Sequence, residues 1–191
     1  MTKGIAGPIE SLADGEAPAR ERAARAIFEA GAELIASLLR EWLADPELAS
    51  CLDTGRGPQI TVGIAVEPQR FDVIRRANGS PALADVPPDQ DAKEIELYLP
   101  GGVRLDILTS RDPLADGAIA RFLRKFGEGI QQIEVDAKDV DRATEILKTR
   151  FGVRPIFPAA RPGANGTRVN FFLATAPSGS KLLVELVCSD R

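Results

Sequence analysis

One order of elements, strand–helix–strand–strand, is predicted twice between residues 59 and 187. In the first copy, "QITVGIAV" alternates like a strand and "PQRFDVIRRA" has helical spacing, while "KEIELYL" and "VRLDILT" flank a Pro-Gly-Gly hairpin turn. The second copy consists of "GIQQIEV", "DVDRATEILKTRFG", "RPIFPA", the turn-rich "RPGANGT", "RVNFFLA" and "KLLVELV". This duplication predicts an α+β domain of two similar modules, residues 58–110 and 128–189, joined by a helix at about 114–126.

Each predicted strand has one apolar face and one face of polar or small side chains, because successive side chains of a strand point to opposite sides. Helices would cover the apolar face. The other face carries the polar side chains Thr61, Glu94, Asp106, Gln132 and Glu185. An exposed sheet face would produce this pattern, and so would a curled mixed sheet around a central polar cavity.

The chain contains no histidine. This excludes Ser-His-Asp and Cys-His triads, imidazole general catalysis, and zinc or iron sites built on histidine. Any acid–base chemistry would therefore rest mainly on carboxylates. Cys51 and Cys188 are too few for a Cys₄ zinc site and are expected to be small buried hydrophobes. A net charge of −4 without a basic run argues against a nucleic-acid partner.

Residues 1–55 are predicted to be a helical extension and linker in front of the domain at 56–191. A helix over 18–44 carries a broad apolar stripe, "DPELASCL" forms a second short helix, and "DTGRGP" reads as a linker. The stripe would pack either on its own domain or against a second copy, and its width does not choose between them. We expect a homodimer to which this helix contributes.

No apolar run approaches the roughly 20 residues of a membrane span. The start of the chain also lacks the apolar segment of a signal peptide. We therefore expect a cytoplasmic protein without a membrane partner.

Residues 59–188 resemble the vicinal-oxygen-chelate superfamily, which includes glyoxalases, and most of all its methylmalonyl-CoA epimerase branch. The resemblance is most specific in "IARFLRKFGEGIQQIEVDAKDVDRATEILKTRFGVRPI" and in "RPGANGTRVNFFLATAPSGSKLLVELV". It implies paired βαβββ modules whose sheets curl around a metal site. The N-terminal extension is outside the resemblance.

The resemblance also implies four metal-ligand positions, which fall on Thr61, Asp106, Gln132 and Glu185. The family has histidine at the first and third of these, so "QQ" stands where the epimerases have "HH". Hydroxyl, amide and carboxylate oxygens without any imidazole suit Zn²⁺, Co²⁺ or Ni²⁺ poorly and could hold Mg²⁺, Ca²⁺ or Mn²⁺ only weakly. We expect these positions to have lost the metal, and no cofactor to be bound.

Three functions remain open, ranked here in order. The first is a metal-free protein that binds a small or acyl-type ligand in a polar cavity, as bleomycin-resistance relatives do without metal; Arg104 and Asn170 are further cavity candidates. The second is an epimerase or isomerase of acyl-CoA thioesters, with Glu94 as the base and Glu185 opposite. In that enzyme Arg104 or Arg168 would replace the metal as the group that stabilises the enolate. The third is a dimeric structural or regulatory module that uses the N-terminal helix.

Two weaker motifs are interpreted as ordinary surface. "PGANGT" suits a hairpin loop better than a phosphate-binding loop. Arg121, Arg124 and Lys125 form a basic end on the connecting helix, which is expected to be a solvated face.

Overall fold

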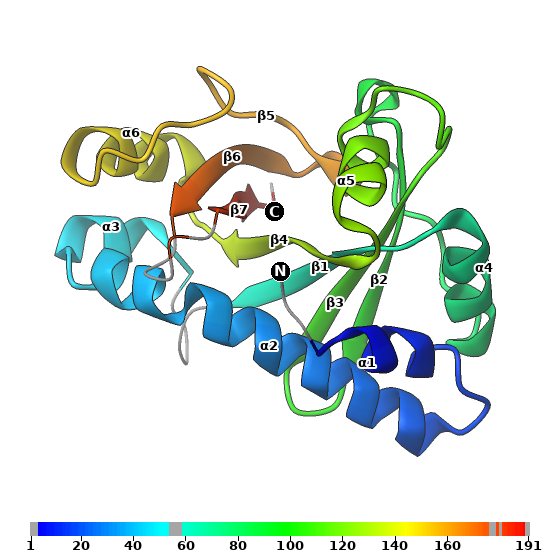
Figure 1. Cartoon of the computed structure of the whole chain (residues 1–191). Coiled ribbons are helices and arrows are strands. Elements are labelled where there is room, and N and C mark those ends of the chain that lie inside the picture. Colours follow the sequence, from blue (N-terminus) through cyan, green and yellow to red (C-terminus); the bar gives the residue numbers. More distant parts are fainter. Residues whose placement is uncertain (1–3, 54–58, 176–178, 180, 190–191) are drawn as a thin grey trace. The chain divides into compact units, whose positions relative to one another are not determined.

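The computed structural model describes residues 4–53, 59–175, 179 and 181–189 (Figure 1). The chain divides into two compact units. The first contains the chain up to Gly31 and residues Thr61–Gln131, and the second contains Ala32–Ile60 and the chain from Gln132 onward. Each predicted module lies almost entirely in one unit. Residues 54–58 of the predicted linker lie outside the described part.

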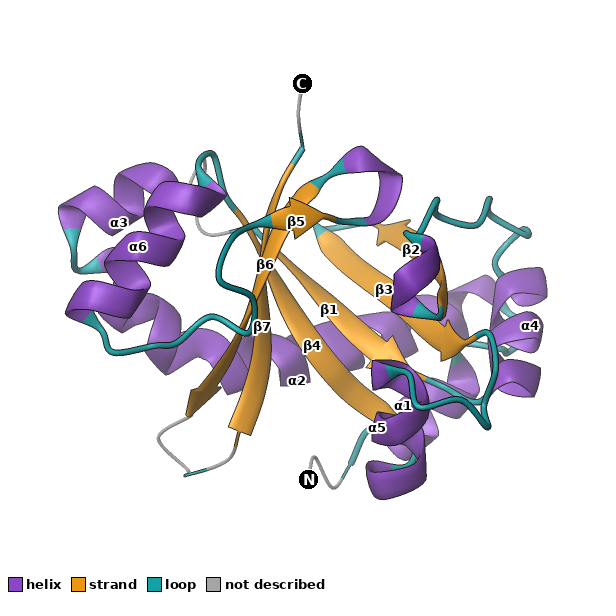
Figure 2. Ribbon diagram, turned by 90° about the horizontal axis from the view of Figure 1, so that it is seen from above, coloured by secondary structure: helices purple, strands orange, loops and turns teal. Residues whose placement is uncertain are grey.

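The first unit holds three strands in the order β2-β3-β1 (Figure 2). The strand β1 (Ile60–Ala65) runs parallel to β3 (Val103–Ser110), and β2 (Ala92–Leu99) runs antiparallel to β3. The hairpin between β2 and β3 turns through Gly101 and Gly102, whose φ angles of 81° and 76° favour glycine. The helices of this unit include α1 (Ala6–Ser11), α4 (Pro68–Ala77), α5 (Ala118–Phe126) and the short 3₁₀ turn η1 (Pro88–Gln90).

The second unit repeats this plan with the strand order β4-β7-β6-β5. The strand β4 (Gly129–Asp136) runs parallel to β7 (Lys181–Cys188), and β6 (Arg168–Thr175) runs antiparallel to β7. The remaining elements are β5 (Arg161–Pro162), α3 (Pro46–Cys51), α6 (Val140–Arg150) and the 3₁₀ turn η2 (Ala164–Gly166). The predicted α+β class and the duplication are confirmed; the central cavity stays a prediction.

The apolar face of every long strand is buried, as alternation predicts. Apolar burial stabilises by roughly 25 cal/mol per Å², so these faces supply most of the driving force for folding. The buried strand residues include Val62, Ile64, Ile95, Leu97, Leu105, Ile107, Ile133, Val135, Val184 and Leu186. Helix α4 adds Phe71 and Ile74 to the core of the first unit, and α6 adds Ile146 and Leu147 to that of the second.

The predicted N-terminal helix is α2 (Ala17–Leu43), and its apolar stripe is buried within one chain. Ile27 and Ile35 are fully buried, and Trp42 nearly so. The stripe is therefore already covered without a second copy, which favours packing on the same chain. Among the described residues, no helix combines the length and apolar character that crossing a membrane requires.

The predicted strand "RPIFPA" at 154–159 is wrong. This segment makes a single bridge between Pro155 and Phe172, and the Ile156 N–H donates to the Phe171 carbonyl at 2.7 Å. Pro155 and Pro158 have no N–H to donate, so a regular ladder does not form. The strand β5 lies instead in the segment predicted to be a turn. Helix α1 was not predicted.

Candidate functional site

The two units carry polar residues at equivalent positions of the duplicated module. In the first unit Asp106 on β3 pairs in register with Gly63 on β1, and Thr61 lies two residues before Gly63. In the second unit Glu185 on β7 pairs with Glu134 on β4, and Gln132 lies two residues before Glu134. Alternation therefore places Thr61 on the face of Asp106, and Gln132 on the face of Glu185. The four predicted ligand positions thus form two equivalent pairs.

All four of these side chains are buried in the protein. Thr61 is 8% exposed, Asp106 3%, Gln132 7% and Glu185 7%. Asp106 and Glu185 are the two buried carboxylate residues of the described part of the chain. Burying a carboxylate costs several kcal/mol unless other groups compensate it, so two such residues at equivalent positions indicate a functional site.

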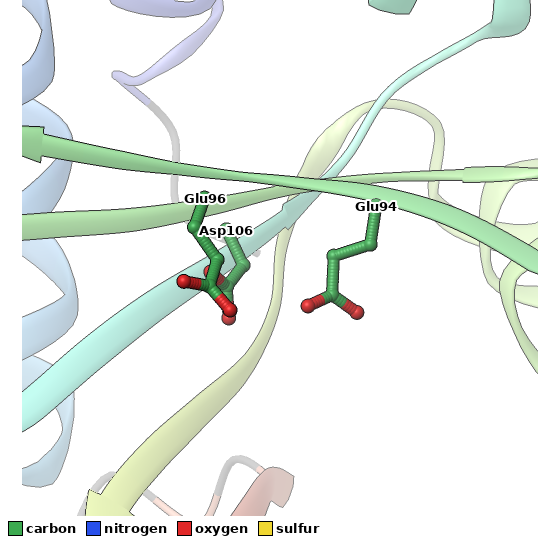
Figure 3. Close-up of side chains that lie close together, drawn as sticks. All are labelled: Glu94, Glu96 and Asp106. Carbon is green, nitrogen blue, oxygen red and sulfur yellow. The ribbon is translucent and has the colours of Figure 1, made fainter. Parts of the chain in front are cut away.

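In the first unit, an acidic cluster is formed by Glu94 and Glu96 on β2 and Asp106 on β3 (Figure 3). One carboxylate oxygen from each residue lies within 4.8 Å of those of the other two. The antiparallel register brings Glu96 opposite Asp106. Glu94 and Glu96 are half-buried, so their carboxylates remain within reach of solvent.

Tyr98 and Arg104 extend the same face. They pair in register at the hairpin end of β2 and β3, and the Tyr98 hydroxyl donates to Glu96 Oε2 at 2.5 Å. Desolvation of the hydroxyl and its hydrogen bond to Glu96 raise the pKa of Tyr98 above its ordinary value. The hydroxyl therefore remains a proton donor throughout the neutral range.

In the second unit, a single amide group connects two carboxylates. Gln132 Nε2 donates to Glu185 Oε2 at 2.7 Å and to Glu134 Oε1 at 3.0 Å. An N–H placed between two acceptors reduces the cost of keeping like charges close together. Gln132 on β4 therefore holds together the two acidic groups of this face.

Aromatic side chains border this second cluster. Phe171 on β6 pairs in register with Glu185, and the Phe157 ring meets the Phe171 ring edge-on at 6.1 Å between centroids. The Arg161 guanidinium lies 4.6 Å from the centre of the Phe157 ring. This face therefore offers an apolar wall beside its carboxylates, whereas the corresponding face of the first unit is mainly acidic.

The donor atoms do not fit the transition metal that the superfamily implies. Gln132 turns N–H groups, and not its carbonyl oxygen, toward Glu185. Thr61 and Asp106 offer only a hydroxyl and a carboxylate. Sets of oxygen donors of this kind match Mg²⁺, Ca²⁺ or Mn²⁺. Among the described residues, the spacing that would allow such an ion is found at Glu94, Glu96 and Asp106.

Two of the predicted site residues, Asn170 and Arg168, lie on the face of β6 opposite to that of Phe171. Asn170 pairs with Leu186, and its amide contacts Thr144 Oγ1 on α6 at 3.4 Å. The structure thus places this predicted cavity residue against a helix, because the register of β6 turns it away from Glu185. Arg168 is likewise directed to α6, where it pairs with Asp141 at 2.7 Å.

Several residues of these faces were not singled out from the sequence. Alternation along β2 already puts Glu96 and Tyr98 with Glu94, so these two were within reach of the sequence. Phe157 and Phe171 were not, because no local pattern reveals that Phe171 pairs with Glu185.

No family model matches this chain, and no curated protein matches it. Solved structures do. The methylmalonyl-CoA epimerase from Mycobacterium tuberculosis shares 30% sequence identity at a TM-score of 0.56, over 69% of this chain and 87% of the epimerase. A hypothetical protein from Bacillus halodurans shares 28% at 0.56, over 69% and 93% of the respective chains. A variant methylmalonyl-CoA epimerase from Streptomyces coelicolor, in complex with 2-nitronate-propionyl-CoA, shares 26% at 0.55, over 74% and 95%.

These similarities, together with the duplicated module, define a glyoxalase-like protein. The chain belongs to the vicinal-oxygen-chelate superfamily, and its structural neighbours there are methylmalonyl-CoA epimerases.

Proposed function

We propose that this protein binds an acyl-thioester ligand, and that the polar face of each unit is by itself a candidate binding surface. The observation that carries the proposal is the burial of Asp106 and Glu185 at equivalent positions of the two modules. Stability alone does not favour two buried carboxylates, whereas a binding site for a polar ligand does. The acyl-CoA analogue bound by the Streptomyces coelicolor epimerase supports the choice of ligand class.

Each face, taken by itself, offers groups that suit such a ligand. Arg104 carries N–H donors that can bind a thioester or carboxylate oxygen, and the Tyr98 oxygen, whose proton goes to Glu96, can accept from the ligand. Phe171 and Phe157 offer apolar surface to a short acyl chain. Carboxylates at Asp106 and Glu185 would accept from hydroxyl or amide groups of the ligand.

We further propose that binding requires no transition metal. Gln132 already satisfies one oxygen of Glu185 with an N–H, which takes the place of a cation in compensating that carboxylate. The polar face of the second unit can therefore be assembled from the chain's own side chains.

Isothermal titration with propionyl-pantetheine, a short acyl thioester, tests this function. We expect saturable binding by the full chain. Asp106→Asn should weaken it about tenfold if the ligand binds the first unit, and Glu185→Gln should do so if it binds the second, since a charge-assisted hydrogen bond contributes about 1.5–3 kcal/mol. The matched control is Glu145→Gln, an exposed carboxylate of α6. Absence of binding by the wild type, or equal affinity in all variants, would contradict the proposal.

The alternative is an epimerase or isomerase, favoured by the position of Glu94. This carboxylate is half-buried on the same face as Asp106 and Arg104. As a base, Glu94 would take the α-proton of the acyl thioester, and the C–H electron pair would form an enolate. Water would donate a proton to the other face of the α-carbon and so invert it, and the proton held by Glu94 would neutralise the hydroxide released. Arg104 would stabilise the enolate oxygen.

Proton exchange separates the two functions. An epimerase replaces the α-proton of methylmalonyl-CoA by deuterium in D₂O, whereas a binding protein does not, and the NMR signal of that proton reports the difference. Glu94→Gln should abolish exchange and leave binding of propionyl-pantetheine within about threefold. No exchange above background with the wild type would exclude the epimerase.

A further inference from the structure

The C-terminal half of α5 carries an arrangement that the clusters above do not use. Arg121, Arg124 and Lys125 line a hollow of about 310 Å³ together with Asp116, which precedes the helix. All four residues belong to the first unit. From the sequence this basic end was expected to be an ordinary solvated face.

The two arginines are held in place by the loop before α5. Arg121 Nη1 donates to the Asp116 carbonyl at 2.8 Å and to its carboxylate at 3.3 Å. Arg124 donates through Nη1 to the carbonyls of Pro113 and Ala115 at 3.1 and 2.8 Å, and through Nη2 to the Asp116 carboxylate at 3.3 Å. Both side chains are thereby held beside Asp116.

The charge of this hollow opposes that of the chain. Three cations and one carboxylate give its lining a net charge of +2, in a chain whose net charge is −4. The Arg121 and Arg124 side chains are 58% and 48% exposed, so both guanidiniums can still reach a ligand. A guanidinium carries five N–H donors in a planar fork that matches phosphate oxygens. The hollow therefore suits an anion of more than one charge.

An exposed aromatic ring lies next to one of these cations. Phe126 is 53% exposed, and the Lys125 ammonium lies 5.0 Å from the centre of its ring. Phe122 supports Phe126 from within the helix, with 5.3 Å between ring centroids. Aromatic side chains beside arginine and lysine are the combination that binds nucleotides, because the base stacks on the ring while the cations bind the phosphates.

We propose that the end of α5 binds an adenosine phosphate, the part that distinguishes acyl-CoA from a simple acyl thioester. Arg121, Arg124 and Lys125 bind its phosphate groups, and Phe126 stacks on the base. This proposal rests on the proposed function in one respect, namely that the nucleotide is the one attached to the acyl-thioester ligand.

Isothermal titration with three probes tests the proposal on the full chain. Propionyl-CoA carries both parts, propionyl-pantetheine only the acyl thioester, and adenosine 3′,5′-bisphosphate only the nucleotide. We expect the double variant Arg121→Glu and Arg124→Glu to weaken binding of propionyl-CoA and of the bisphosphate at least about tenfold, since two cation–phosphate attractions are replaced by two repulsions. Affinity for propionyl-pantetheine should stay within about twofold.

The matched control reverses two exposed arginines elsewhere in this unit, Arg22→Glu and Arg76→Glu, and changes the net charge equally. It should leave all three affinities unchanged, and circular dichroism should show that both variants are folded. Phe126→Ala should weaken the bisphosphate without affecting propionyl-pantetheine.

Each result separates the inference from the proposed function. Equal affinity for propionyl-CoA and propionyl-pantetheine, or equal loss in both double variants, overturns the α5 site and leaves acyl-thioester binding intact. Arginine-dependent binding of the bisphosphate without any binding of propionyl-pantetheine keeps the nucleotide site and removes the acyl site. Failure of the bisphosphate and of propionyl-CoA to bind the wild type overturns the inference.

Discussion

Gln132 on β4 donates its side-chain amide to the Glu185 carboxylate on β7 at 2.7 Å, across two parallel strands that are 53 residues apart in sequence. Both side chains are buried, and the same amide reaches Glu134 at 3.0 Å. The glutamine at this position therefore has a structural role. It is the donor that makes the buried Glu185 carboxylate, beside the half-buried Glu134, compatible with folding.

Replacing Gln132 by leucine should destabilise the protein by about 1–3 kcal/mol, because a buried carboxylate loses a donor. Urea denaturation measures this free energy of unfolding. Gln131→Leu is the matched control, since its Oε1 is buried without a hydrogen-bond partner in the described structure and its loss should be nearly neutral. Equal destabilisation by the two changes would mean that the hydrogen bond contributes nothing.

Protein purified without chelators should contain far less than one Zn, Co, Ni or Fe per chain. The reason is the donor set, which has no imidazole and turns the Gln132 N–H toward Glu185. Elemental analysis by mass spectrometry measures the content. If one of these metals is found near one per chain and is lost in the Asp106→Asn, Glu185→Gln variant, the metal-free interpretation is wrong.

Acid should destabilise the second unit through the ion pairs between α3 and α6. Hydrogen bonds from the Leu48 N–H and Arg150 lower the pKa of Asp45 from its ordinary 3.8, and Arg142 and Arg150 lower the pKa of Glu47 from 4.5. A carboxylate with a lowered pKa in the folded state stabilises it above the unfolded pKa. This contribution is present at neutral pH and is lost as the pH falls through about 4 and below.

The variant Asp45→Asn, Glu47→Gln tests this pH dependence while keeping a side chain that can cap α3. Its deficit in unfolding free energy relative to the wild type should be present at pH 7 and shrink at pH 3. Arg142→Gln, Arg150→Gln removes the other partners and should show the same trend. A deficit of equal size at both pH values would assign the effect to packing.

Replacing Trp42 by alanine should cost about 3–5 kcal/mol, because its side chain is almost fully buried within one chain. Glu41→Ala changes the exposed neighbour on the same helix and should stay within about 0.5 kcal/mol of the wild type. Thermal unfolding followed by circular dichroism compares them.

Because α2 contributes this buried apolar stripe, deletion of residues 1–52 should leave the remainder unfolded. A folded truncated protein would contradict it.

The full chain is predicted to be a homodimer to which α2 contributes. Because the apolar stripe is buried, only the exposed side of α2 is left for this contact, and Glu29 and Glu33 lie there. Light scattering should give a molar mass of twice the 20.4 kDa of one chain. The double variant Glu29→Lys, Glu33→Lys should lower this mass toward that of a single chain. A dimer that persists in this variant removes α2 from the interface, and a monomeric wild type removes the dimer.

Much of the fold followed from local patterns. Alternation identified the long strands and their apolar faces, and helical spacing identified α2, α4, α5 and α6 within a few residues. Alternation failed at residues 154–159, where two prolines interrupt the hydrogen-bond ladder. The stripe of α2 was visible, but its partner was not, because a helix presents the same face to its own core and to a second chain.

The residue types alone set the chemistry that this protein has available: no imidazole, and a hydroxyl, carboxylate or amide at Thr61, Asp106, Gln132 and Glu185. Which of these groups meet depends on how the strands pair. Alternation is a property of one strand, whereas register depends on pairing between distant segments. Register is what sets Glu96 beside Asp106, Phe171 beside Glu185, and turns Asn170 toward α6.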